Sequence, residues 1–257
     1  MLKSDPIQAV ANALLKARAD HVLCDAAHLA GHLVTADDAY RVQALVAGRL
    51  ANAAASSPPC WKSGGASRDA AFTHAALPAD GVWSSPADAS AWPFHLRLIE
   101  IEIALRLRRQ ITAAEAVDLT QDSARVLVDA MAVSIEIVDS RFQQGLAAPA
   151  LLKLADLQTH GALVLGDWVP FVARDWATQV ASVRIGAKPP MEFRGSHSMN
   201  DPAWVLPAWL RHATREGAPA PAGTVVTTGT WCGILLAGRG DRVTARFDGV
   251  GQAVVQL

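Results

Sequence analysis

The chain has 257 residues, of which 51% are hydrophobic, and its formal net charge at pH 7 is −1. This apolar content is enough for a sizeable core and argues against a disordered chain. The near-zero charge gives no bulk attraction to nucleic acid or to anionic membranes, so neither is expected as a partner. An anionic ligand has to be held by local groups.

The cysteines and the N-terminal residues bear on the cellular compartment. Cys24, Cys60 and Cys232 are far apart in the sequence and form no CxxC or Cys/His cluster, so no zinc site is indicated. The opening residues MLKSDPIQAV lack the apolar run of a signal peptide. No stretch reaches the roughly 20 apolar residues needed to cross a bilayer. We therefore expect a cytoplasmic protein.

Two helices are predicted near the N-terminus. Asp5 followed by Pro6 is typical of an N-cap with proline at the first helical position, and apolar residues then follow helical spacing. A second helix is expected to begin near Thr35, where Asp38 completes a capping arrangement. We expect this helical hairpin to serve packing or an oligomer contact.

The middle of the chain changes character. Residues 53–93 are rich in Ala, Ser, Pro and Gly, which predicts functional loops or a disordered lid. Helices are expected at 121–130, capped by Thr120, and at 204–214. The expected strands are 97–107, 132–138, 162–166, 180–185, 224–228, 242–247 and 252–257. A turn at 248–251 predicts that the last two strands form a hairpin.

These elements predict an α+β fold. Residues 1–60 are expected to form an N-terminal helical portion. Residues 61–257 are expected to form a β-rich catalytic body, continuous with that portion as one structural unit.

The most informative segment alternates isoleucine with glutamate. Ile99, Ile101 and Ile103 share one face of a predicted strand, so Glu100 and Glu102 share the other, with their Cα atoms about 7 Å apart. A second predicted strand repeats the pattern around one more glutamate.

That second glutamate is Glu136, which lies opposite Ile135 and Ile137. If the two strands are neighbours, three carboxylates meet, and a divalent cation would offset their repulsion. Oxygen ligands without His or Cys suit Mg²⁺ or Mn²⁺ better than zinc. The alternative is a solvated strand face paired with Arg97 or Arg106.

Several stretches resemble one family, in that family's order. They are IEIEIAL at 99–105, EIVDSRF at 136–142, ADLQTHGALVLG at 155–166, AWL at 208–210, TTGTWCG at 227–233 and GDRVTARFDGVGQAVV from Gly240. The chain resembles the 2-hydroxypenta-2,4-dienoate (2-keto-4-pentenoate) hydratases of the fumarylacetoacetate hydrolase superfamily, over roughly its last 160 residues. That superfamily also contains oxalocrotonate decarboxylases and acylpyruvate hydrolases.

The resemblance implies a mixed β-roll or barrel-like body with an N-terminal helical portion. It also implies Mg²⁺ or Mn²⁺ held by Glu100, Glu102 and Glu136. Lys62 stands where the family has a substrate-facing lysine, in a context that matches only in part, and Asp80 lies one residue away from the family's active-site acid. These two are the implied catalytic residues.

The same resemblance implies a set of substrate-binding residues, which are Asp156, Thr159, Thr228, Gly229 and Thr230. The sequence departs from the family at Leu157, where an asparagine is usual. No motif singles out His160 or His197, so ordinary structural roles are expected for both.

The implied activity is the addition of water to a 2-hydroxy-2,4-dienoate, which gives a 4-hydroxy-2-oxo acid. The implied partner is therefore a small 2-oxo or 2-hydroxydienoic acid, and a homo-oligomer is expected. Decarboxylation of the oxalocrotonate type and carbon–carbon hydrolysis of an acylpyruvate use the same metal chemistry and remain open. A catalytically silent homologue that binds an oxo-acid also remains open, because the surroundings of Lys62 and Leu157 are altered.

Overall fold

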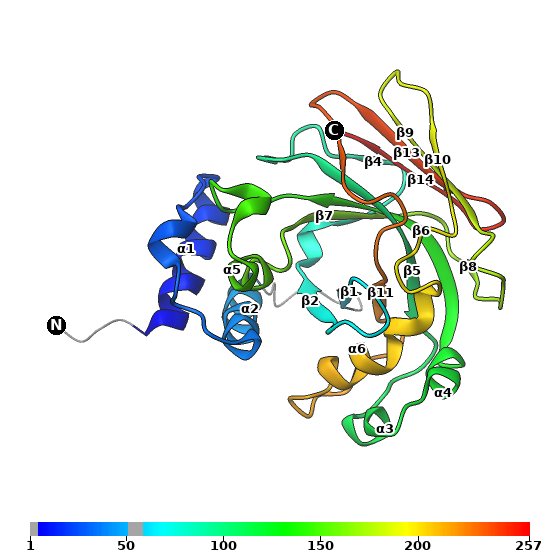
Figure 1. Ribbon diagram of the computed structural model, residues 1–257, viewed down its shortest axis with the longest axis horizontal. Coiled ribbons are helices and arrows are strands. Elements are labelled where there is room, and N and C mark those ends of the chain that lie inside the picture. The colour runs from blue at the N-terminus through cyan, green and yellow to red at the C-terminus, as the bar shows by residue number, and fades with distance from the viewer. Residues whose placement is uncertain (1–4, 51–58) are drawn as a thin grey trace.

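The computed structural model describes residues 5–50 and 59–257, and its centre is a curled sheet (Figure 1). Along this sheet the strands follow the order β2-β1-β11-β5-β6-β7-β3, with β12 paired to β5 and β8 paired to β6. Its strands are β1 (Cys60–Gly64), β2 (Thr73–Leu77), β3 (Val82–Ser84), β5 (Leu98–Leu107), β6 (Val128–Val138), β7 (His160–Leu165), β8 (Val169–Pro170), β11 (Val225–Thr227) and β12 (Leu235–Leu236).

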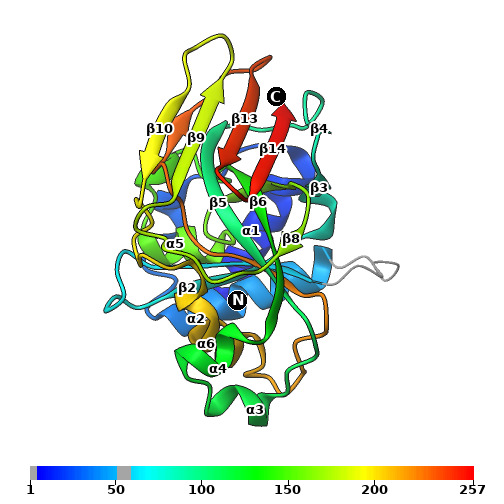
Figure 2. The same cartoon turned by 90° about the vertical axis from the view of Figure 1, so that its right-hand side faces the viewer.

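A smaller sheet packs against the large one, as the view in Figure 2 also shows. Its strand order is β10-β9-β13-β14-β4. The strands are β4 (Ala87–Asp88), β9 (Val180–Ile185), β10 (Met191–Arg194), β13 (Arg242–Phe247) and β14 (Gly251–Gln256). The main core lies between the two sheets, where the isoleucines of β5 meet apolar residues of β9, β13 and β14.

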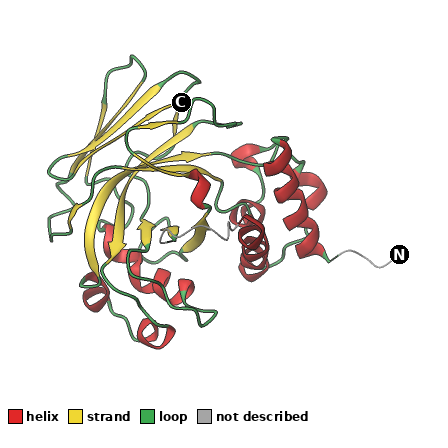
Figure 3. Ribbon diagram, turned by 180° about the vertical axis from the view of Figure 1, so that it is seen from behind, coloured by secondary structure: helices red, strands yellow, loops and turns green. Residues whose placement is uncertain are grey.

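The helices lie in two groups, α1, α2 and α5 in one and α3, α4 and α6 in the other (Figures 1 and 3). They are α1 (Pro6–Asp20), α2 (Ala36–Leu50), α3 (Ala113–Val117), α4 (Gln121–Arg125), α5 (Ala150–Ala155) and α6 (Leu206–Ala213). Short 3₁₀ turns cover Ala26–Leu29, Ala79–Gly81, Gly145–Ala147 and Pro202–Val205. No helix within the described ranges is both long enough and apolar enough to span a membrane.

A second, smaller core joins the N-terminal helices to the body. It contains Leu14 of α1 and Val42 of α2, and both pack with Phe142 and Leu152 from the later part of the chain. The N-terminal helices thus share apolar burial with α5, while the boundary at residue 60 stays a prediction.

The predicted starts of the two N-terminal helices are confirmed. The Asp5 carboxylate accepts from the Ile7 amide at 3.0 Å. Thr35 and Asp38 cap each other's backbone amides, at 3.2 and 3.0 Å. The predicted C-terminal hairpin is also confirmed, since β13 pairs with β14 and residue 247 lies opposite residue 251.

Two local predictions are wrong. The predicted irregular stretch at 53–93 holds β1 to β4 in its described part, while residues 53–58 lie outside the described residues. These strands are short and poor in β-branched residues, and neighbouring strands rather than local propensity stabilise them, because β1 pairs with both β2 and β11. The predicted helix at 121–130 ends at Arg125, and strand β6 begins at Val128.

Candidate metal centre

The register of β5 and β6 brings the three predicted glutamates together. The strands are antiparallel, with Glu100 directly opposite Glu136 and Glu102 opposite Ser134. One carboxylate oxygen from each glutamate lies within 4.8 Å of the other two. The isoleucines of β5 are fully buried on the other face, so the same alternation that closes the core also directs the carboxylates into one place.

Burial and mutual repulsion raise the proton affinity of two of these carboxyls. Desolvation, followed by the charge of Glu136, raises the pKa of Glu100 to about 8 and the pKa of Glu102 to about 7. Burial acts the same way on Glu136, but Lys62 and His160 outweigh it and hold the pKa of Glu136 below its ordinary value. Of the three carboxyl groups, Glu136 therefore has the lowest proton affinity.

Lys62 extends from β1 to the carboxylates. Its Nζ lies 2.5 Å from Glu136 Oε1 and also donates to the Gln158 carbonyl at 3.3 Å. Burial alone would lower the pKa of Lys62, but attraction to Glu136 and Glu100 outweighs burial, and the pKa lies above its ordinary value. The side chain is thus a fixed ammonium group within the site.

The site opens into a hollow of about 400 Å³ that is lined by Lys62, Glu100 and Glu102. Residues of the segments 63–66, 158–159 and 227–230 line it as well. Of the predicted substrate-binding residues, Thr159, Gly229 and Thr230 line this hollow. The Gly229 amide donates to Glu102 Oε2 at 2.9 Å, which fixes that carboxylate. The hydroxyls of Thr159 and Thr230 donate to nearby carbonyl groups.

Other predicted residues lie elsewhere. Asp80 is exposed and lines a separate cavity of about 1040 Å³, which also contains Arg106. Thr228 is fully buried and donates to the Ile103 carbonyl at 2.8 Å, so its hydroxyl serves the sheet. The predictions of direct contact by Asp80 and Thr228 therefore find no support in the geometry of the hollow.

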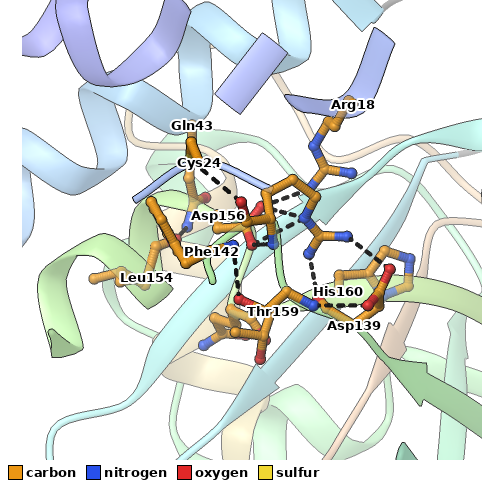
Figure 4. Close-up of polar contacts among 12 residues, drawn as sticks. Arg18, Cys24, Gln43, Asp139, Phe142, Leu154, Asp156, Thr159 and His160 are labelled. Atoms are coloured by element: carbon orange, nitrogen blue, oxygen red, sulfur yellow. Dashed lines mark hydrogen bonds and ion pairs between the residues drawn. The ribbon is translucent and has the colours of Figure 1, made fainter. Parts of the chain in front are cut away.

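Asp156, also predicted to bind substrate, belongs to a buried ion-pair network (Figure 4). Its carboxylate accepts from Arg141 Nε at 2.8 Å and from Arg18 Nη2 of α1 at 2.9 Å. The Arg141 amide donates to it as well, at 3.0 Å. With its oxygens occupied in this way, Asp156 ties α1 to the body and does not line the hollow.

Sequence reasoning missed two contributors to the site. His160 is buried, and its Nδ1 lies 3.0 Å from Glu136 Oε1. Gln158 supplies a carbonyl to Lys62 and lines the hollow. No spacing rule links either residue to Glu136, because the contact depends on how β7 begins. His197 donates to the Thr228 carbonyl at 2.8 Å, in line with the structural role expected for it.

The residues present fit a hard divalent cation. When all three carboxyl groups are ionised they face one ammonium, so excess negative charge would lie in a buried place unless a cation balances it. Glu136 Oε2 is buried and has no hydrogen-bond partner among the described residues. All the candidate ligand atoms are carboxylate oxygens, the type that Mg²⁺ and Mn²⁺ prefer.

The curled mixed sheet and its cluster of three carboxylates together make this chain a candidate for a protein that binds a cation through oxygen ligands. Residues 76–257 match the family described as Fumarylacetoacetate (FAA) hydrolase C-terminal, and the chain belongs to that family. Lys62 lies before the matched region. No curated protein sequence matches the chain.

Solved structures share the fold at low sequence identity. The 4-oxalocrotonate decarboxylase from Pseudomonas putida G7, complexed with magnesium and adipate, is 18% identical and superposes with a TM-score of 0.83 over 100% of this chain and 98% of that one. The same enzyme complexed with calcium and acetate gives a TM-score of 0.82, again at 18% identity over 100% of this chain and 98% of that one. The fumarylpyruvate hydrolase from Pseudomonas aeruginosa, in complex with Mn²⁺ and pyruvate, is 16% identical with a TM-score of 0.55 over 78% of this chain and 89% of that one. These likenesses establish the fold and confirm the predicted fold class.

Proposed function

We propose that this chain is a Mg²⁺- or Mn²⁺-dependent enzyme that binds a 2-oxo acid and stabilises its dienolate form. The observation that carries the proposal is the meeting of Glu100, Glu102 and Glu136 beside the Lys62 ammonium at one hollow. Solved relatives of this fold are complexed with magnesium or manganese and with small acids, namely adipate and pyruvate.

The chemistry divides between the cation and the protein. A bound divalent cation supplies Lewis-acid stabilisation of negative charge on the substrate's 2-oxygen. Lys62 has three N–H donors, of which Glu136 and Gln158 accept two, so one is left to face the substrate. That donor can stabilise charge on the 2-oxygen and supply a proton there.

Among the possible reactions, the arrangement favours decarboxylation of a 2-oxo-3-enedioic acid. The C5–C6 bond breaks and C6 leaves as CO₂, while the electron pair moves through the conjugated system to the 2-oxygen. Protonation of that oxygen gives 2-hydroxypenta-2,4-dienoate. This step needs stabilisation of negative charge only on the 2-oxygen, next to Lys62 and to the cation that the three carboxylates would hold. Hydration needs in addition an acid for C5 and a positioned water, and the predicted acid, Asp80, lines a different cavity.

Hydration of a 2-hydroxy-2,4-dienoate is the second candidate. The polar groups of Thr159 and Gln158 line the hollow and offer partners for a water molecule. The ordered motifs that resemble the hydratases, from residue 99 onwards, point the same way.

To test this, the protein and Mg²⁺ or Mn²⁺ are incubated with a 2-oxo-3-enedioate, a 2-hydroxy-2,4-dienoate or an acylpyruvate in separate reactions. The products are identified by mass spectrometry. We expect CO₂ and the five-carbon dienoate from the first. Glu102→Gln should remain folded and lose this activity, whereas Asp80→Asn should keep it. Formation of a 4-hydroxy-2-oxo acid that depends on Asp80 would favour hydration. Binding without turnover of any of the three acids would overturn both assignments.

A further inference from the structure

His160 makes a contact at the metal centre that the proposed chemistry does not use. Its ring is buried at the start of β7, with Nδ1 lying 3.0 Å from Glu136 Oε1. The same oxygen accepts from Lys62 Nζ at 2.5 Å. A carboxylate only accepts hydrogen bonds, so the ring nitrogen that faces it has to carry the proton.

Because of these two donors, the two oxygens of the Glu136 carboxylate have different surroundings. Oε1 is held from two directions by nitrogen donors, while Oε2 is buried with no hydrogen-bond partner among the described residues. Glu100 and Glu102 approach the same carboxylate group. Oε2 is therefore the oxygen left for a cation, and the rotation of the carboxylate about its axis is set by what holds Oε1.

The chain just before His160 has an unusual backbone. Leu157, Gln158 and Thr159 all have left-handed backbones, with φ of 52°, 56° and 58°. Such conformations cost about 1 kcal/mol or more each for residues other than glycine, and they persist only where the surroundings determine them. Here one turn places the Gln158 carbonyl on Lys62 and, two residues later, the His160 ring on Glu136.

Polar contacts hold the backbone on both sides of this turn, and Figure 4 shows those of Asp156 and Thr159. Asp156 before the turn is fixed by Arg141 and Arg18, and the Thr159 carbonyl accepts from the Asp139 amide at 2.8 Å. After it, a Cβ on Gly161 would lie only 2.6 Å from the Ile137 carbonyl oxygen, so the backbone of β7 is tightly seated there. The backbone that carries the buried His160 ring is therefore held on both sides.

We propose that His160 is a positioning residue that holds the Glu136 carboxylate so that one oxygen meets Lys62 and the other is free to bind the cation. This inference rests on the cation-binding part of the proposed function and is independent of which reaction the enzyme catalyses. Losing an outer partner of a metal ligand weakens metal binding by about 10–100-fold.

The experiment measures Mn²⁺ binding directly, by electron paramagnetic resonance of the free ion and by calorimetry, without substrate. His160→Leu removes the donor at similar volume, and we expect its Mn²⁺ dissociation constant to rise by about 10–100-fold. His160→Asn places an amide N–H near the position of Nδ1, so most of the affinity should return. His74→Leu changes a buried histidine that bonds to Ser63 rather than to a glutamate of the centre, and it controls for general loss of packing.

Circular dichroism and thermal unfolding establish that each variant is folded before binding is measured. Equal Mn²⁺ affinity in wild type and His160→Leu would overturn the inference, as would equal weakening in the Leu and Asn variants or in the His74 control. Wild-type protein that binds neither Mn²⁺ nor Mg²⁺ would overturn the inference together with the cation-dependent function. Wild-type protein that binds Mn²⁺ but turns over none of the acids would overturn only the proposed reaction.

Discussion

Replacing Lys62 by methionine tests the electrostatic account of the site most directly. Lys62 is 12% exposed and Glu136 is 1% exposed, so the substitution leaves a buried carboxylate without its ammonium. Breaking a buried ion pair by removing one partner costs about 3–5 kcal/mol. Because Lys62 itself no longer has to be desolvated, we expect the low end, about 3 kcal/mol, for the protein without cation. For a chain of this length that lowers the Tm by about 6–12 °C.

The size of this loss should depend on pH and on the cation. With Lys62 gone, Glu136 can relieve the repulsion by taking up a proton, so the loss should be smaller at pH 6 than at pH 8. A divalent cation supplies the missing positive charge. Addition of Mg²⁺ should therefore raise the Tm of Lys62→Met by more than it raises the Tm of the wild type.

Thermal unfolding of chelator-treated protein at both pH values, with and without added Mg²⁺, measures these effects. Lys188→Met removes an exposed lysine and should change the Tm little in every condition. A stabilising Lys62–Glu136 ion pair is contradicted if the cation-free Lys62→Met protein unfolds at the wild-type temperature at pH 8. Equal shifts of both proteins by Mg²⁺ would contradict it as well.

Further predictions concern the stability of the fold. Burial lowers the pKa of His74 to about 4 from an unfolded value near 6.5, so the folded protein should lose stability as pH falls through this window, by at most about 3 kcal/mol from this group. Urea unfolding of His74→Gln should show a shallower acid loss, and an unchanged slope would contradict the assignment. Gly161→Ala should cost about 1–3 kcal/mol, because the new Cβ meets backbone at 2.6 Å, whereas Gly48→Ala on the open face of α2 should gain up to about 1 kcal/mol. Similar changes in urea midpoint for the two glycine variants would contradict this pair of expectations.

The core of the candidate site was open to prediction because strand geometry is regular. A strict alternation of isoleucine and glutamate fixes which side chains share a face, whatever the rest of the fold does. Pairing of Glu100 with Glu136 then needed only that two predicted strands be neighbours, which the register of β5 and β6 provides. Helix caps were predictable for the same reason, since their chemistry is local.

The rest depended on distant partners. The segment around Lys62 has weak strand propensity, and it is extended because β11, from much later in the chain, pairs with it. The prediction for Asp80 came from a family motif matched with an offset of one residue. Such a match does not fix which way the side chain faces, and Asp80 lines another cavity. The left-handed turn at 157–159 contains no glycine, so no sequence signal marked it.

Strand β5 contributes to both the candidate metal centre and the core of this protein, one from each of its faces. Burying Glu102 is unfavourable, and it is tolerated only in a strand whose other face gains enough from burial to hold it in place. That face carries Ile99, Ile101 and Ile103, each fully buried against the second sheet, and full burial of one such side chain contributes about 1.5–3 kcal/mol. A slip of β5 by one residue would exchange the two faces, placing glutamates in the core and isoleucines in the hollow. The register that keeps the fold together is therefore the same register that assembles the carboxylates.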